Sequence, residues 1–179
     1  MAALHLSPIK HSSYGIKLLS PQDAAQLQIL FAQCGDFFVM TNGVPAKATA
    51  AVEEFTAVPN GKTPEDIRAL GLVDNCDRLV GTSIGVQGYP DPQTWWLGLM
   101  LLAPEQRRQG LGTGFYRALE QWIADQGYRF VSLCAIAPNT GGRQFWQRLG
   151  FENIRQVPSR RYGTRTHDVY VYRRKIWPL

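Results

Sequence analysis

The sequence predicts an α/β fold, in the α+β sense of a mixed but mostly antiparallel central sheet with helices on both faces. Two observations predict it. Between Ala69 and Leu102, three strand-like segments follow one another through short turns, which is typical of antiparallel neighbours. A strand, an amphipathic helix and a second apolar strand come next, and this order implies parallel pairing through a right-handed crossover.

The composition is that of an ordinary globular protein. The chain has 179 residues, of which 45% are hydrophobic and 18% charged, so we expect one domain over residues 1–179. No apolar run approaches the roughly 20 residues that span a bilayer. Residues 1–13 lack the continuous hydrophobic segment of a signal peptide and are expected to form a short, loosely ordered lead-in. These features predict a cytoplasmic protein without membrane contact.

Cysteine and histidine usage points to neither disulfides nor a metal. The three cysteines are odd in number and widely spaced, which favours reduced thiols in a cytoplasm. The three histidines show no metal-ligand spacing, so no metal is predicted. The net charge of +5 is compatible with nucleic-acid binding, but no helix-turn-helix, zinc-finger or RRM signature accompanies it. A phosphate-bearing cofactor accounts for a positive surface equally well, and nucleic acid is the disfavoured partner.

The N-terminal third predicts one strand and two helices. The strand is expected over Tyr14–Leu19, and Ser20 with the proline after it begins a helix that Gly35 should end. A hydrophobic stripe predicts a second helix over Pro45–Ala57. The segment Thr63–Ile67 fits either a single capped helical turn or a loop.

Strands dominate the middle of the chain. The hairpin strands are expected over Ala69–Val73 and Leu79–Val86, and a third strand over Thr94–Leu102. The amphipathic helix that follows should stop at Gly127. The apolar run Phe130–Ile136 then predicts a strand buried on both faces.

A last helix and two strands complete the expected order. Asn139 is placed as a helix N-cap and Gly150 as a left-handed residue at the helix end. The two final strands are expected over Phe151–Val157 and His167–Arg173, around a turn at Gly163. Edge strands here are compatible with a homodimer, although nothing in the sequence requires one.

A glycine-rich loop separates the Thr94–Leu102 strand from its helix. Its arginines and glycines are Arg107, Arg108, Gly110, Gly112 and Gly114. Unpaired N–H groups at a helix start, together with the helix dipole, form an anion site, and glycines let a ligand approach the backbone. A Walker loop is excluded because no lysine follows the glycines. The dinucleotide fingerprint fits poorly because the third glycine comes one residue early.

Two segments carry a resemblance to a known family. Residues 102–112 read Leu-x-Pro-x-x-Arg-x-x-Gly-Leu-Gly, which resembles the acyl-CoA-binding motif of the GNAT superfamily of N-acyltransferases, Gln/Arg-x-x-Gly-x-Gly/Ala. Residues 139–151 read Asn-x-x-Gly-x-x-Phe-Trp-x-x-Leu-Gly-Phe and are similar to the second cofactor segment of that family. The two segments occur in order, about one strand apart. The predicted element order is also similar to the GNAT fold.

The resemblance implies acetyl-CoA as co-substrate. Backbone N–H groups of the glycine loop would hold the pyrophosphate, and the backbone near Leu102 would pair with the pantetheine arm like an added strand. Asn139 and Phe145 would flank the arm, and for Asn139 helix capping is an equally good role. The residues expected to contact acetyl-CoA are Leu101, Leu102, Arg107, Arg108, Gln109, Gly110, Leu111, Gly112, Thr113, Gly114, Asn139 and Phe145.

The resemblance further implies acetyl transfer to a primary amine, by direct attack in a ternary complex. A backbone N–H near Leu102 would stabilise the oxyanion. The acceptor stays open between a small-molecule amine and a protein amine. Two other functions stay open as well: a non-catalytic CoA-binding module and, with less support, a basic nucleic-acid-binding domain.

The general acid and base are not identified by the sequence. Many family members place a tyrosine that acts as general acid four residues before the glycine of Gly-Phe. Here that position is Trp146, which cannot usefully transfer a proton. The weak catalytic candidates are Tyr170, Cys134 and Glu54. Other residues of suitable type are Tyr162 and Tyr172 for the acid, and Glu53, Asp91, Asp168 and His167 for the base.

Overall fold

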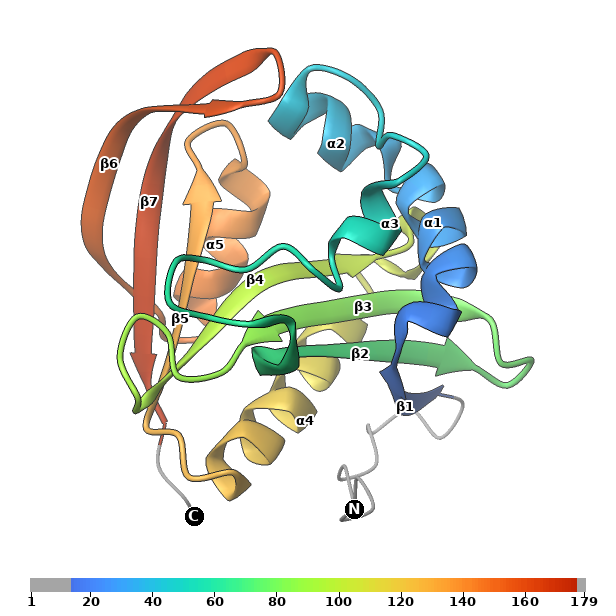
Figure 1. The fold of residues 1–179 in the computed structure, drawn as a ribbon, viewed down its shortest axis with the longest axis horizontal. Helices are drawn as coiled ribbons and strands as arrows, with labels where there is room; N and C mark the ends of the chain where they lie inside the picture. The colour runs from blue at the N-terminus through green and yellow to red at the C-terminus, as the bar shows by residue number, and fades with distance from the viewer. Residues whose placement is uncertain (1–13, 177–179) are drawn as a thin grey trace.

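The computed structural model describes residues 14–176, so the expected lead-in over residues 1–13 lies outside the described residues. Its strands are β1 (Tyr14–Leu19), β2 (Ile67–Asp74), β3 (Leu79–Val86), β4 (Thr94–Leu102), β5 (Phe130–Ile136), β6 (Glu152–Tyr162) and β7 (Arg165–Lys175). They form one sheet in the order β1-β2-β3-β4-β5-β7-β6 (Figure 1). The β4–β5 pair is parallel and the other pairs are antiparallel. The predicted mixed, mostly antiparallel sheet is therefore confirmed.

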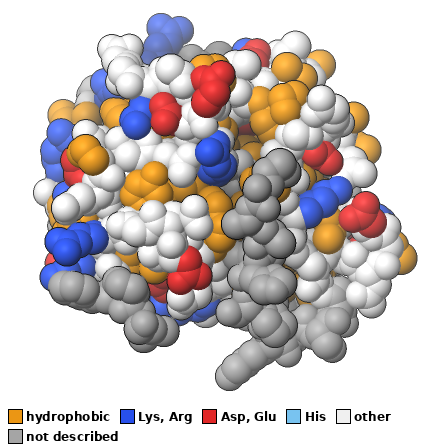
Figure 2. Space-filling model, turned by 60° about the horizontal axis from the view of Figure 1, so that its bottom comes forward, with side chains coloured by type: hydrophobic (Ala, Val, Ile, Leu, Met, Phe, Trp, Pro, Cys, Tyr) orange, Lys and Arg blue, Asp and Glu red, His pale blue; other side chains and the backbone are white. Residues whose placement is uncertain are grey.

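Helices cover both faces of this sheet, as predicted. The α-helices are α1 (Ala24–Gln33), α2 (Gly35–Asn42), α3 (Ala50–Glu53), α4 (Leu111–Asp125) and α5 (Thr140–Arg148). Three 3₁₀ turns accompany them: η1 (Pro21–Asp23), η2 (Pro64–Asp66) and η3 (Pro104–Gln106). Helices α1, α2 and α3 lie on one face, and α4 and α5 lie on the other (Figure 1). Within residues 14–176, no helix is long and apolar enough to cross a membrane. Charged side chains of both signs are interspersed on the face shown in Figure 2.

The alternation of side chains along β2 feeds two separate cores. Leu70 and Leu72 pack with α4 residues, whereas Ile67 and Ala69 pack with α1 residues. This is the two-residue period of a strand that is covered on both faces. The sheet is therefore a rigid layer between two helical layers, and a ligand can pass from one layer to the other only where the strands separate.

Several local predictions are confirmed. Strands β1 and β5 have the expected bounds. The segment Thr63–Ile67, whose sequence fits either a helical turn or a loop, contains the turn η2, where Thr63 and Asp66 make a capping box. Asn139 caps α5, and Gly150 has the left-handed φ of 86° expected at a helix end.

The expectation that Gly35 ends the first helical region is wrong. Helix α1 ends at Gln33, and Gly35 is the first residue of a second helix, α2. Cys34 lies at the junction, and the chain changes direction there without a left-handed residue. The left-handed end comes eight residues later, at Gly43 (φ 82°).

The predicted helix over Pro45–Ala57 is also wrong in extent. Only Ala50–Glu53 forms α-helix, followed by turns. Ala51 and Phe55 are buried as expected, but Val52 from the same predicted stripe is 55% exposed. Burial of two residues anchors one helical turn against α1, because too little of the apolar stripe is covered to stabilise a longer helix.

The two parallel strands separate part-way along β4. Pairing of β4 with β5 runs from Thr94–Phe130 to Leu97–Leu133, yet β4 continues to Leu102. The bulge between β3 and β4 falls at the same point, where Gly98 is passed over in the register. Beyond this point the edge of β4 that faces β5 is open.

Candidate active site

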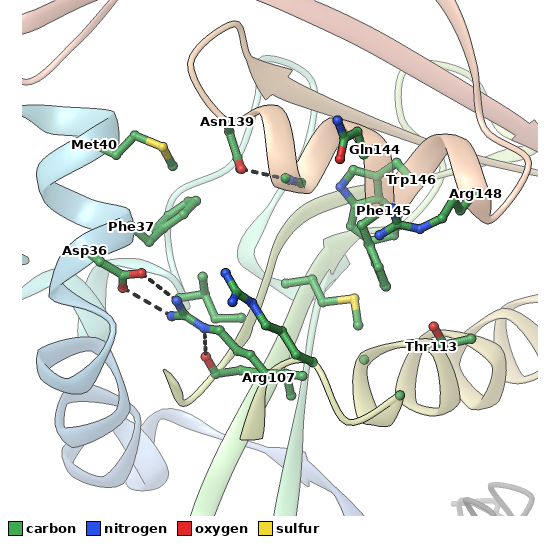
Figure 3. Close-up of a pocket in the computed structure, with 18 residues that line it drawn as sticks. Asp36, Phe37, Met40, Arg107, Thr113, Asn139, Gln144, Phe145, Trp146 and Arg148 are labelled. Atoms are coloured by element: carbon green, nitrogen blue, oxygen red, sulfur yellow. Dashed lines mark hydrogen bonds and ion pairs between the residues drawn. The ribbon is translucent and has the colours of Figure 1, made fainter. Parts of the chain in front are cut away.

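A cavity of about 670 Å³ occupies the open edge of β4 (Figure 3). It is lined by α2 from one helical layer and by α4 and α5 from the other, so it passes through the gap in the sheet. The predicted cofactor residues in its wall are Leu101, Leu102, Arg107, Arg108, Gly110, Gly112, Thr113, Asn139 and Phe145. This volume is in the range of small-molecule sites.

Three predicted cofactor residues are not part of the wall. The Leu111 side chain is buried in the core beneath α4. Gly114 donates its backbone N–H to Gly110, and the Gln109 side chain donates to the carbonyl of Glu105. These residues shape the loop from behind, so the backbone N–H groups of Gln109 and Leu111 remain as candidates for ligand contact, whereas that of Gly114 is already bonded.

The loop before α4 presents a run of unpartnered backbone donors. Arg108 and Gly110 both have positive φ angles, 62° and 80°, and Gly110 is the N-cap of α4. Within residues 14–176, no group accepts a hydrogen bond from the backbone N–H groups of residues 108–113. Such a run at the positive end of a 15-residue helix is an anion-binding arrangement.

The Arg107 side chain is engaged within the protein. Its Nε donates to the carbonyl of Leu102 at 2.9 Å, and its two terminal nitrogens donate to the two carboxylate oxygens of Asp36 (Figure 3). The Arg107 guanidinium holds the pKa of Asp36 below its usual range. The thiol of Cys34 lies 3.4 Å from the same Leu102 carbonyl. Arg107 therefore ties the glycine loop to α2 and to the end of β4.

The opposite wall of the cavity is the start of α5. The Asn139 side chain accepts the backbone N–H of Gly142 at 2.9 Å, which confirms its capping role. Gly112 faces Phe145 across the cavity: a Cβ there would lie 3.6 Å from the Phe145 ring and 3.4 Å from a methyl of Leu102. The lack of a side chain at Gly112 thus leaves room between α4 and α5.

Trp146 is a packing residue as well as part of the wall. Its ring makes edge contacts with Tyr116, Phe145 and Phe151 at centroid distances of 5.5, 4.8 and 5.3 Å. It is half-buried and reaches the cavity. The neighbouring Tyr116 hydroxyl is buried, and within the described residues it has no hydrogen-bond partner. Burial raises the pKa of this hydroxyl.

The candidate acids Tyr170 and Cys134 lie outside the cavity wall. The Tyr170 ring faces α5, and the Arg143 guanidinium is stacked 3.9 Å from its centroid. Cys134 lies on the opposite face of the sheet, close to Tyr162. Burial raises the pKa of the Cys134 thiol and raises that of Tyr162 to about 12. Tyr172 is buried and accepts a hydrogen bond from Arg143.

Most candidate bases have structural partners. Glu53 pairs with Lys47, and Asp91 with Arg173. Asp168 accepts hydrogen bonds from β6, and His167 is bonded to the carbonyl of Thr41. Glu54 differs from these residues. It is half-buried, burial raises its pKa to about 7, and no cation of the described chain pairs with it.

Sequence reasoning missed the contribution of α2 to the wall. Asp36, Phe37 and Met40 line the cavity from that helix (Figure 3). Met100, Gly141, Gly142, Gln144, Trp146 and Arg148 complete the lining. The helical spacing of Phe37 and Met40 was the available signal, but it was hidden by the expectation that Gly35 ended the helix.

Comparison with known proteins identifies the family. A sequence model of the acetyltransferase (GNAT) family matches residues 40–151, which include β2 to α5 and the cavity loop. The chain belongs to the GNAT acetyltransferase family. GNAT enzymes use acyl-CoA as acyl donor, so an acyl-CoA is the donor class for this chain. No curated protein matches the sequence.

Solved GNAT structures share the fold over almost the whole chain. An acetyltransferase from Thermus thermophilus is 23% identical, with a TM-score of 0.70 and coverage of 92% of this chain and 97% of that one. The ribosomal-protein-S18-alanine N-acetyltransferase from Escherichia coli is 15% identical (TM-score 0.70, coverage 92% and 94%). A GCN5-related N-acetyltransferase from Kribbella flavida is 17% identical (TM-score 0.68, coverage 92% and 98%). At these identities the likeness establishes the fold.

Proposed function

We propose that this GNAT protein transfers an acetyl group from acetyl-CoA to a primary amine, by direct attack in a ternary complex. One observation carries the proposal. The unpartnered N–H groups before α4 and the open edge of β4 belong to one cavity that passes through the sheet. A ligand with a phosphate-rich end and an amide-containing arm fits both parts.

The strand end offers hydrogen bonds to such an arm. The N–H of Ala103 donates to Val80 on β3. Because successive residues of a strand point to opposite edges, the N–H and carbonyl of Leu102 face the gap instead. Arg107 already occupies the Leu102 carbonyl, which leaves the N–H as a candidate donor to a thioester carbonyl. Asn139 and Phe145 would flank the arm from α5.

The energetics require both parts of the cavity. Charge-assisted hydrogen bonds contribute about 1.5–3 kcal/mol each, whereas micromolar binding needs about 8 kcal/mol after the costs of association. Phosphate contacts alone are therefore marginal. Contacts along β4 would make the affinity sufficient and would also hold the acyl group in place.

Departure of the CoA thiolate does not strictly require an acid. A thiol has a reference pKa of about 8.5, so it is a tolerable leaving group near neutral pH. Trp146 supplies no acid at the usual position. If proton donation limits the rate, Trp146→Tyr should raise kcat while the KM for acetyl-CoA stays unchanged. An unchanged kcat would instead indicate unassisted departure.

Ligand-dependent thermal stability tests the cofactor assignment. Acetyl-CoA and CoA should raise the melting temperature, whereas NAD and ATP should not, because stabilisation follows the affinity for the folded state. Gly112→Asp should abolish this shift by placing a carboxylate in the phosphate site. Gly112→Ala is the matched control, since its Cβ would meet only ordinary contacts. No shift with either CoA species would refute the proposal.

Thiol release from acetyl-CoA in the presence of amines then tests catalysis. The expected result is amine-dependent release with a 1:1 acetylated product. Binding of CoA without release by any amine would favour the non-catalytic CoA-binding module. The absence of the tyrosine at position 146 is the specific observation behind that second candidate.

A further inference from the structure

The β6–β7 hairpin crosses over to α2 and is fastened there (Figure 1). Thr164 donates both its backbone N–H and its hydroxyl to the carbonyl of Asn42, at 2.9 and 3.0 Å. The His167 Nε2 donates to the carbonyl of Thr41 at 2.9 Å. The hairpin thus meets the C-terminal end of the helix whose N-terminal part lines the cavity.

A β-bulge in β6 lets the hairpin bend toward α2. The register of β6 shifts between Val157 and Arg160, and Ser159 has a positive φ of 53°. The Asp168 carboxylate accepts the backbone N–H of Ser159 and the side-chain amide of Gln156, both at 3.1 Å. Such a bulge re-aims the side chains that follow it.

The pairing register of β6 with β7 shows which arginines of β6 lie on the face of the sheet that carries α2. Arg155 lies opposite Val171, and Val171 lies opposite Cys134 on β5. Arg160 lies opposite His167, whose ring contacts α2. Residues opposite each other in a sheet share a face, so Arg155 and Arg160 both lie on the face that carries α2. Arg161, opposite Thr166, points to the other face.

This face is next to the reacting end of the proposed cofactor site. Cys134 directly follows Leu133, the last β5 residue that pairs with β4. The anion-binding start of α4 lies in the opposite helical layer, so a ligand threaded through the gap would present its acyl end on the α2 side. Two strand spacings of about 4.8 Å separate β6 from β5, and the gap lies on the far side of β5, so the bend of the hairpin toward α2 is needed to bring the two arginines toward it (Figure 1).

Within residues 14–176, neither Arg155 nor Arg160 has an acidic partner. Building on the proposed function, we propose that the amine acceptor also carries an anionic group, bound by Arg160 with support from Arg155. Two exposed guanidinium groups on the face where the acyl end of the proposed cofactor would emerge favour such an acceptor, because arginine binds carboxylate and phosphate groups in a bidentate manner.

The surroundings of Arg160 connect its charge with the face of the sheet that carries α2. Arg160 is exposed, and its positive charge lowers the pKa of both Cys134 and Tyr162 against the effect of burial, so the guanidinium lies within electrostatic range of both groups.

Matched amines test the proposal in the thiol-release assay. Alanyl-glutamate amide is compared with alanyl-glutamine amide, and 2-aminoethyl phosphate with ethanolamine, which also distinguishes carboxylate from phosphate. For at least one pair, kcat/KM should be roughly tenfold higher for the anionic member, as expected for one charge-assisted contact. Arg160→Glu should remove this preference, whereas Arg161→Glu, on the other face of the same strand, should keep it. The KM for acetyl-CoA should be unchanged in both variants.

The outcomes separate this proposal from the proposed function. The anionic acceptor alone would be overturned if the charged and uncharged members of each pair gave equal kcat/KM. It would also be overturned if acetyl-CoA stabilised the chain but no anionic amine was acetylated. Absence of any stabilisation by acetyl-CoA would overturn both. Loss of binding to an RNA oligonucleotide in Arg160→Glu, with unchanged amine preference, would overturn it in favour of a nucleic-acid surface.

Discussion

Glu54→Gln should stabilise the protein, and increasingly so as the pH rises. The pKa of Glu54 is raised to about 7 from an ordinary 4.5, first by burial and then by the charge of Glu53. A raised pKa means that the folded state binds the proton more tightly than the unfolded state. The stability that the protonated Glu54 contributes is complete below the pKa of the unfolded state and is lost as the pH rises through the pKa of the folded state. The ionised carboxylate therefore opposes folding above about pH 7.

The size of this effect follows from the same two values. At about 1.36 kcal/mol per pKa unit, full ionisation in the folded state costs about 3 kcal/mol. Partial exposure of the side chain reduces this, and we expect Glu54→Gln to gain about 1–2 kcal/mol at pH 8.5 and little near pH 4.5. Urea unfolding of both proteins across this pH range measures the difference.

A neighbouring residue is the matched control. The Glu53 side chain is 45% exposed, and its hydrogen bond with Lys47 lowers its pKa, so Glu53→Gln should show no gain at high pH. If Glu54→Gln and the unmodified chain are equally stable at pH 8.5, the Glu54 carboxylate is solvated or paired, and the argument from burial is wrong.

Two further substitutions test the packing around the cavity. Asp36→Asn should weaken acetyl-CoA affinity several-fold by releasing Arg107. The free energy of unfolding should fall by less than about 1 kcal/mol, because the ion pair is partly exposed. Calorimetric titration with acetyl-CoA measures the affinity, with Glu105→Gln as the control. Tyr116→Phe should raise unfolding free energy by about 1 kcal/mol, because it removes a buried hydroxyl without a partner, and a lower urea midpoint would contradict the reasoning.

Local signals predicted the bounds of β1, β3, β4 and β5 because these depend on neighbouring residues, whereas β6 and β7 are longer than predicted. The apolar run of β5 and the capping by Asn139 are local signals of this kind. The α1–α3 region was predicted poorly because tertiary packing decides it. Gly35 can adopt helical angles as readily as it can end a helix, and only the packing of Phe38 against Phe31 selects the former.

The candidate site follows the same division. The glycine loop and the start of α5 are each a continuous segment of sequence, so the motif in each segment indicated which backbone groups line the cavity. The partner of Arg107 is Asp36, 71 residues earlier, and no local pattern connects them. The open edge of β4 was equally invisible, because it depends on where pairing with β5 stops.

Helix α2 has a thermodynamic consequence for the affinities of the two ligands. Its eight residues span about 12 Å, and the same short rod contacts the cavity through Phe37 and the hairpin through Asn42. A ligand that shifts one end of this rod must shift the other. Donor and acceptor should therefore alter each other's affinity, and by the same factor, since such coupling is reciprocal.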